Sequence, residues 1–203
     1  MSPRNKYMKT DERKAATVDT VVKLAAEGNP SEITTTEIAK KMGVTQGALF
    51  KHFPTKEAIV QAVIEWVADM LLSRIDKAAR SASSPLAAIE AMFYAHIDFV
   101  TEHPGAPRML MGQLQRSKVT APKKMATALM EFYRGRIQDQ LDLGKIEDEV
   151  SKDLDSEAAA TLMVGMIQGL VIQSLMINDV TRIRLEAPKV FSVYKRGIES
   201  RHD

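Results

Sequence analysis

Hydrophobic residues recur at intervals of three and four along almost the whole chain, which is the spacing of one buried face of an α-helix. The first segment with this pattern covers residues 13–27 and ends at the helix-breaking sequence Gly28-Asn29-Pro30. Its apolar face is formed by Val18, Val21, Val22 and Ala25. The same spacing predicts further helices at about 55–80, 84–103, 108–116, 121–143, 155–178 and 187–200. Together with two short helices between residues 34 and 53, and no convincing strand pattern, this predicts an all-α fold of about nine helices.

The two short helices meet at Gly43. Thr34 and Glu37 form a capping-box pattern, in which the hydroxyl and the carboxylate each satisfy a free backbone N–H at the start of the first helix. Gly43 is expected to end that helix with a positive φ, and Thr45 to cap the next one. The residues expected to face the core are Ile38, Ala39, Met42, Val44, Leu49 and Phe53. This pattern is typical of a helix-turn-helix, which places its second helix in the major groove of DNA.

The outward positions of this motif carry side chains suited to DNA. Gln46 can pair with adenine, Ala48 can meet a thymine methyl group, and Gly47 lets the helix approach the duplex. Hydroxyl and basic side chains suit phosphates, as does the N-terminus of the helix that follows. A generic helical hairpin with a solvated polar face is the alternative interpretation.

Charge and composition add three points. The net charge of the 203 residues is only +2, but residues 1–57 hold ten basic and seven acidic side chains, a net of +3, and the remainder carries −1. The positive excess therefore lies with the motif, as phosphate neutralisation requires. The absence of Cys excludes a disulfide framework and Cys-ligated zinc. The polar N-terminal segment has no apolar stretch of a secretory signal, so we expect a cytoplasmic protein.

The motif also resembles one family closely. The runs T-T-x-x-I-A and M-G-V-T-x-G-A-L-F-x-H-F-P-T-K-E resemble the signature of TetR-type bacterial transcriptional regulators, and the resemblance covers about residues 10–66. Position 50 is Phe where that family often has Tyr, so only apolar contact with the DNA backbone is expected there. The predicted DNA contacts are Thr35, Thr36, Thr45, Gln46, Gly47, Ala48, Phe50, Lys51, His52 and Lys56.

The resemblance implies an all-helical homodimer that binds a palindromic operator, most simply as a repressor. It also implies a C-terminal domain in which a small molecule binds and lowers the DNA affinity. We accordingly expect a DNA-binding domain at residues 1–57 and a ligand-binding and dimerisation domain at residues 58–203.

Residues 158–178 contain no charged side chain over 21 positions. This length could span a bilayer, but Gln168, Gln173 and Ser174 interrupt it, so we expect no membrane contact. A helix that is apolar all round is buried on both sides, which points to a second subunit. The predicted interface residues are Gly165, Gly169, Gln173, Phe191 and Tyr194. The alternative is that the last two helices only fill the core of one subunit.

The ligand site is less well defined by the sequence. Twelve Met residues are many for this length, and their flexible, polarizable side chains suit an adaptable apolar cavity, although they also fill ordinary cores. A largely apolar effector is therefore expected, without further identity. The candidate lining residues are Met92, Phe93, His96, Phe99, Met109, Met130, Met163 and Met166.

No motif of a metalloprotease, serine hydrolase, P-loop or dinucleotide-binding enzyme is found, and the four His residues at 52, 96, 103 and 202 have no metal-ligand spacing. We therefore expect no enzyme activity, no cofactor and no metal. A helical small-molecule or lipid carrier without regulatory DNA binding is the alternative function, and it gives no reason for the helix-turn-helix.

Overall fold

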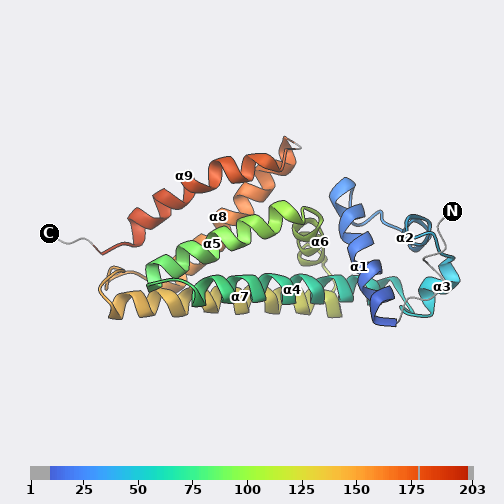
Figure 1. The fold of residues 1–203 in the computed structure, drawn as a ribbon, viewed down its shortest axis with the longest axis horizontal. Coiled ribbons are helices and arrows are strands. Elements are labelled where there is room, and N and C mark those ends of the chain that lie inside the picture. The colour runs from blue at the N-terminus through green and yellow to red at the C-terminus, as the bar shows by residue number, and fades with distance from the viewer. Residues whose placement is uncertain (1–9, 178, 201–203) are drawn as a thin grey trace. The chain divides into compact units, whose positions relative to one another are not determined.

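The computed structural model describes residues 10–177 and 179–200, and within these ranges the chain forms nine α-helices and no strand (Figure 1). The all-α prediction is confirmed. Residues 1–9, Asn178 and His202 lie outside the described residues. The helices are α1 (Thr10–Glu27), α2 (Thr35–Lys41), α3 (Gln46–Phe50), α4 (Lys56–Arg80), α5 (Pro85–Glu102), α6 (Gly105–Leu114), α7 (Ala121–Ile146), α8 (Ser156–Met176) and α9 (Thr181–Ile198).

The helices group into two compact units. The N-terminal unit comprises residues 1–67 and 103–126, and the C-terminal unit comprises residues 68–102 and 127–203. Helix α4 contributes its first half to the N-terminal unit and its second half to the C-terminal unit. Residues 103–126, which include α6, join the N-terminal unit although they follow α5 in the chain.

In the N-terminal unit, the apolar face of α1 is buried as its spacing predicts, and α6 packs against it. The contact is close at one point, because a Cβ on Gly105 would lie 1.9 Å from the carbonyl oxygen of Val22. Only a glycine fits at the start of α6 when the backbone of α1 is that near. The Arg108 guanidinium also donates a 3.3 Å hydrogen bond to the Gly28 carbonyl, just beyond the end of α1.

Two helices begin earlier than their sequence pattern indicated. Helix α6 starts at Gly105 and not at residue 108, because Pro107 lies in its first turn, where a missing N–H removes no helical hydrogen bond. Helix α9 starts at Thr181 and not at residue 187. Asp179 accepts hydrogen bonds from the Thr181 N–H at 3.0 Å and hydroxyl at 2.6 Å, and Pro188 is tolerated inside the helix.

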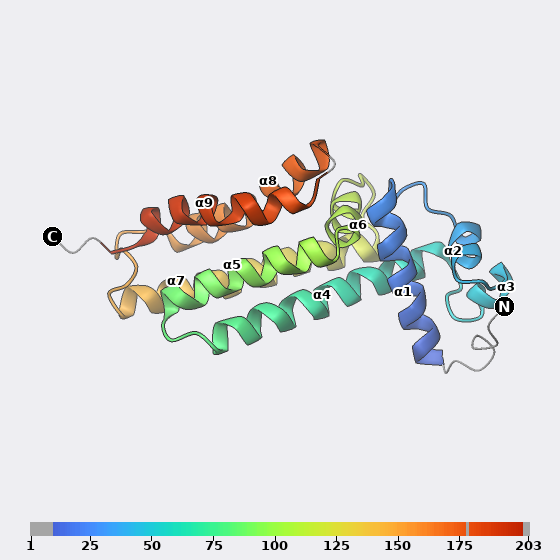
Figure 2. The same ribbon diagram turned by 45° about the horizontal axis from the view of Figure 1, so that its top comes forward.

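In the C-terminal unit, α5, α8 and α9 pack against one another, and Figures 1 and 2 show α8 and α9 side by side. Aromatic rings fill the space between α5 and α9, with the centroids of Phe93 and Phe191 4.9 Å apart. The Tyr194 hydroxyl donates a 3.1 Å hydrogen bond to the Ala159 carbonyl and so ties α9 to α8. Among the described residues, α8 alone is long and apolar enough to cross a membrane, yet it buries one face against these helices.

Candidate functional site

Helices α2 and α3 form the predicted helix-turn-helix, and the two Thr caps and the turn at Gly43 act as expected. The Thr34 hydroxyl accepts a hydrogen bond from the Glu37 N–H, and the Thr45 hydroxyl accepts one from the Ala48 N–H, each at 3.1 Å. Gly43 has a φ of 67° and turns the chain between the two helices. The side chains that hold the motif on its core are Ile38, Ala39, Leu49 and Phe53, all at most 4% exposed. Met42 and Val44 are half-buried.

The outer surface of α3 is open. Gln46, Gly47 and Lys51 are exposed, and Ala48 and His52 are partly exposed. The Gln46 amide nitrogen donates a 2.7 Å hydrogen bond to the Thr35 hydroxyl, so the side chain reaches back to the first turn of α2. Because an NH₂ group has two hydrogens, Gln46 keeps a second donor and its carbonyl oxygen for another partner.

The start of α4 lies beside this surface. The Thr55 hydroxyl accepts a 3.0 Å hydrogen bond from the Ala58 N–H, which leaves other N–H groups of the first turn available to an anion. Exposed Lys56 donates a 3.3 Å hydrogen bond to the Ser31 carbonyl and so lies against the loop before α2. Thr36 is exposed, and the Phe50 side chain is 39% exposed despite its apolar ring.

Basic residues of the N-terminal unit extend beyond the motif. With residues 103–126 included, this unit carries 15 basic and 8 acidic side chains, a net of +7, whereas the C-terminal unit carries 13 and 18, a net of −5. A division of the chain at residue 57 gives only a mild asymmetry, +3 against −1. The sequence does contain a signal for the larger charge difference, because no acidic residue occurs between Glu102 and Glu131. A strongly positive unit attracts a polyanion.

A second feature is the outer face of α8 and α9. Large apolar side chains lie exposed along both helices: Leu162, Ile172, Met176, Leu185 and Val193 are 44–80% exposed. Gly165 is exposed and Gly169 is half-exposed, and a Cβ on either would meet no atom within 4 Å. A groove of about 560 Å³ lies on this face, lined mainly by apolar side chains that include Leu162, Met166, Val190 and Val193.

Phe191 and Tyr194, which we expected at a subunit interface, are only 2% and 3% exposed in the single chain, although Tyr194 also lines this groove. The reason is the register of α9. Its buried face repeats from Ile183 through Ala187 to Ile198 and includes both aromatic residues. The outward face of α9 carries Leu185 and Val193.

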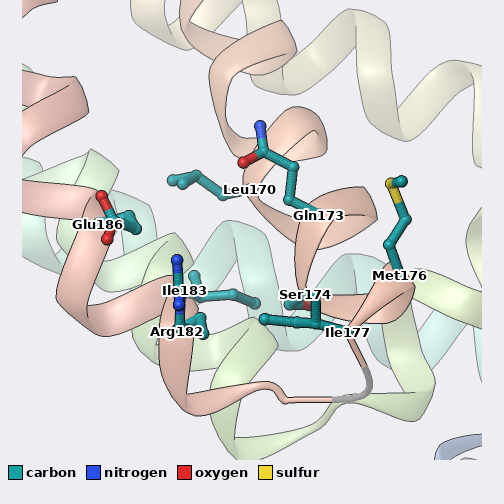
Figure 3. A pocket seen from close by; sticks show the side chains of 8 residues that line it. All are labelled: Leu170, Gln173, Ser174, Met176, Ile177, Arg182, Ile183 and Glu186. Carbon is teal, nitrogen blue, oxygen red and sulfur yellow. The ribbon is translucent and has the colours of Figure 1, made fainter.

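Gln173 lies near the C-terminal end of α8, whereas the groove lies near Leu162. Gln173 lines a small pocket between the C-terminus of α8 and the N-terminus of α9 (Figure 3). The pocket has a volume of about 190 Å³. The close-up shows Gln173 and Met176 entering from α8 and Arg182 and Glu186 from α9. Polar groups thus occur at this end of the exposed face, whereas the groove near Leu162 is apolar.

The candidate ligand residues do not form one group. Five of them are buried in the C-terminal unit: Met92, Phe93, His96, Phe99 and Met163. Met109 is buried in the N-terminal unit. Met130 and Met166 are half-buried on α7 and α8, and Met166 lines the groove described above. Burial lowers the pKa of His96 to about 3, so the imidazole is neutral near pH 7.

Comparison with known proteins agrees with this architecture. Residues 18–63 match the family described as bacterial regulatory proteins, tetR family. The nucleoid occlusion factor SlmA of Haemophilus ducreyi is 33% identical over 172 residues, which cover 85% of each chain.

Solved structures share the fold at lower identity. A TetR transcription regulator from Haloarcula marismortui aligns with a TM-score of 0.79 at 15% identity, covering 94% of this chain and 100% of that one. The transcriptional regulator FadR from Bacillus subtilis, in complex with stearoyl-CoA, aligns with a TM-score of 0.76 at 18% identity, covering 91% and 99%. The chain belongs to the TetR family of bacterial regulatory proteins and is a DNA-binding regulator with a helical C-terminal unit.

Proposed function

We propose that the protein is a homodimeric, ligand-responsive transcriptional repressor that binds a palindromic operator. One chain has a single α3, whereas a palindrome offers two half-sites about 34–36 Å apart in successive major grooves. A second copy must therefore supply the other recognition helix. The observation that carries the proposal is the exposed apolar face of α8 and α9 in a chain whose α3 surface is open and basic.

The dimer would form on the outer face of α8 and α9. Exposed apolar side chains occur on α8 from Leu162 to Met176, and no charged residue interrupts this stretch. Gly165 and Gly169 lie one turn apart with open space above them, so a helix of a second copy can approach closely. A self-complementary face of this kind gives a closed two-fold dimer. An exposed patch of several large apolar side chains favours contact with another protein, because that contact removes the apolar surface from water.

The predicted DNA contacts remain those at the surface of α2, α3 and the start of α4. Gln46, Gly47 and Ala48 would face base edges, and Lys51, His52 and Lys56 would hold phosphates, with Thr35, Thr36 and Thr45 around them. Phe50 would add apolar contact with the backbone. The alternative function, a helical small-molecule or lipid carrier, explains neither this surface nor the net charge of +7 on the N-terminal unit.

An effector would act through the C-terminal unit. The similar FadR structure contains stearoyl-CoA, which supports a small-molecule site in the corresponding helices of this chain. Helix α4 contributes to both units as one continuous helix of 25 residues. A ligand that favours one position of α4 would change the DNA affinity, and a coupling of about 1–3 kcal/mol is typical of allosteric proteins.

DNA binding and dimerisation can be tested together. The purified protein is titrated with selected operator fragments and with unrelated duplex at several salt concentrations, and its mass is measured by sedimentation. We expect a dimer whose DNA affinity falls steeply with salt. Gly169→Glu would place charge in the interface, giving monomers with little operator affinity. The matched control is Gly135→Glu on α7, where a Cβ also meets no atom within 4 Å. A stable Gly169→Glu dimer would refute the interface.

A second candidate function is DNA binding in nucleoid occlusion. It is favoured by the 33% identity to the Haemophilus ducreyi factor over 85% of both chains. The two functions predict different distributions on the chromosome. A repressor occupies a few operators beside promoters, and its deletion changes transcription of the adjacent genes. An occlusion factor occupies many sites, and its deletion changes where septa form relative to the nucleoid.

A further inference from the structure

Two buried polar atoms in the C-terminal unit have no hydrogen-bond partner within the described chain. They are Nδ1 of His96 on α5 and the hydroxyl oxygen of Tyr133 on α7. Their rings meet edge to face, with centroids 5.0 Å apart. His96 is 8% exposed and Tyr133 is 0% exposed. Two unsatisfied groups of complementary hydrogen-bonding type therefore lie together in an otherwise apolar core.

Such groups are rare in folded proteins, because an unpaired buried donor or acceptor costs about 1–3 kcal/mol. Tyr194 in the same unit shows the usual arrangement, in which a buried hydroxyl has a partner: it donates a 3.1 Å hydrogen bond to the Ala159 carbonyl. Tyr133 and His96 have no such backbone partner. Their free hydrogen-bonding capacity is therefore available to a molecule that enters the core.

The charges of the C-terminal unit limit what that molecule can be. Arg74 lies over the Phe99 ring but forms a 2.7 Å ion pair with Glu102. Arg136, one turn along α7 from Tyr133, forms a 2.6 Å ion pair with Asp76. Both cations are already neutralised by carboxylates of the same unit. A carboxylate or phosphate bound beside them would thus lose its hydration and find both guanidinium groups already paired, which disfavours a charged ligand.

Space for a ligand can come from flexible methionine side chains buried in the same unit. Met92 lies one turn before His96 on the same face of α5 and is 1% exposed, and Met163 of α8 is 0% exposed. Methionine side chains change shape at little cost.

We propose that His96 and Tyr133 bind the polar end of an uncharged, mainly apolar ligand that carries a hydroxyl or carbonyl group. A hydroxyl can accept from Tyr133 and donate to Nδ1 of His96, and a carbonyl can accept from Tyr133. The remainder of the ligand lies among the methionine and aromatic side chains. This assignment rests on the proposed effector-binding role of the C-terminal unit and specifies the chemistry of that site.

The experiment uses the full chain without DNA and compares 1-octanol with octanoate, which have the same apolar body. At a 1-octanol concentration ten times its Kd, we expect Tm to rise by about 3–6 °C. Octanoate at the same concentration should leave Tm unchanged. Calorimetric titration then measures Kd for the wild type and for Tyr133→Phe, and we expect about a 3- to 10-fold weaker 1-octanol complex in the variant.

The Tm of the ligand-free variant provides a second readout. If the Tyr133 hydroxyl is unpaired, its removal leaves Tm unchanged or raises it. Tyr94→Phe is the matched control, because Tyr94 lies on the partly exposed face of α5. Removal of the Tyr94 hydroxyl should leave 1-octanol binding unchanged.

Four results would overturn the assignment: no Tm shift with 1-octanol, an equal shift with octanoate, unchanged 1-octanol affinity in Tyr133→Phe, or a lowered Tm of that variant without ligand. The last would mean that bound water already satisfies the hydroxyl. Failure of the repressor function would appear separately, as loss of operator binding by the wild type.

Discussion

The Gln46 side chain on the recognition helix α3 donates a 2.7 Å hydrogen bond to the Thr35 hydroxyl on α2. The residue proposed to read a base is thus held in place before DNA arrives. A fixed side chain loses less conformational entropy on binding than a free one. We therefore propose that Thr35, which the sequence suggested as a phosphate contact, positions Gln46.

Thr35→Val tests this relationship, because it removes the hydroxyl and keeps the shape of the side chain. We expect specific operator affinity to fall about 3- to 10-fold, since one hydrogen bond that orients Gln46 is lost. Affinity for unrelated duplex should stay unchanged. Gln46→Ala should relax the sequence preference at the same base pair. The neighbouring variant Thr36→Val should weaken both kinds of binding together. An unchanged ratio of specific to unspecific affinity in Thr35→Val would contradict the positioning role.

Lys56→Ala is expected to weaken binding to every sequence alike. Lys56 lies at the first residue of α4 and is exposed, where a phosphate would meet both its ammonium group and the helix N-terminus. The slope of log affinity against log salt should become shallower by about 1. Lys23→Ala provides the control, because Lys23 is paired with Asp19 on α1 at 2.8 Å. A change in sequence preference without a change in salt slope would exclude the phosphate role.

Gly105→Ala is expected to destabilise the N-terminal unit. The new methyl carbon would lie 1.9 Å from the Val22 carbonyl oxygen and 2.9 Å from the Ala26 nitrogen, both of them backbone atoms of α1. Overpacking typically costs about 1–3 kcal/mol, and rigid backbone places this site at the upper end. Gly112→Ala on the same helix meets no atom within 4 Å and should raise stability by about 0.5–1 kcal/mol. Equal free energies of unfolding for the two variants would show that α6 does not pack closely on α1.

The local signals of the helix-turn-helix could be predicted from sequence because each acts over three or four residues. Thr34, Thr45 and Thr55 cap the helices that follow them, and Gly43 takes the positive φ of the turn. The burial of Leu49 follows from spacing alone in the same way. Here the sequence determines the structure within one turn of helix.

Contacts between distant segments could not be predicted in that way. The packing of α6 on α1 depends on Gly105 approaching Val22, 83 positions earlier in the sequence, and no periodicity encodes that approach. The orientation of Phe191 could have been found. Extending the spacing of α9 back to Ile183 defines one buried stripe and places Val193 outside it. The missing signal was Asp179, whose carboxylate accepts hydrogen bonds from the N–H and hydroxyl of Thr181, the first residue of the helix.

The buried His96 predicts a pH dependence of stability. Burial lowers its pKa from 6.5 to about 3 in the folded protein. The unfolded chain therefore binds a proton as the pH falls through 6.5, whereas the folded protein remains unprotonated until about pH 3. The contribution of His96 to stability is present above pH 6.5 and is lost progressively as the pH falls from 6.5 to about 3.

Between pH 7 and pH 5 this loss should amount to about 2 kcal/mol of unfolding free energy, at 1.36 kcal/mol per pH unit. Denaturant titrations of the wild type, His96→Gln and His96→Leu at both pH values measure it. Carboxylates titrate alike in all three proteins, so the difference between wild type and variants isolates the imidazole. Both variants should lose about 2 kcal/mol less than the wild type over this interval. Parallel profiles for the three proteins would mean that His96 has the same pKa in the folded and unfolded protein, and the lowering of its pKa by burial would then have to be abandoned.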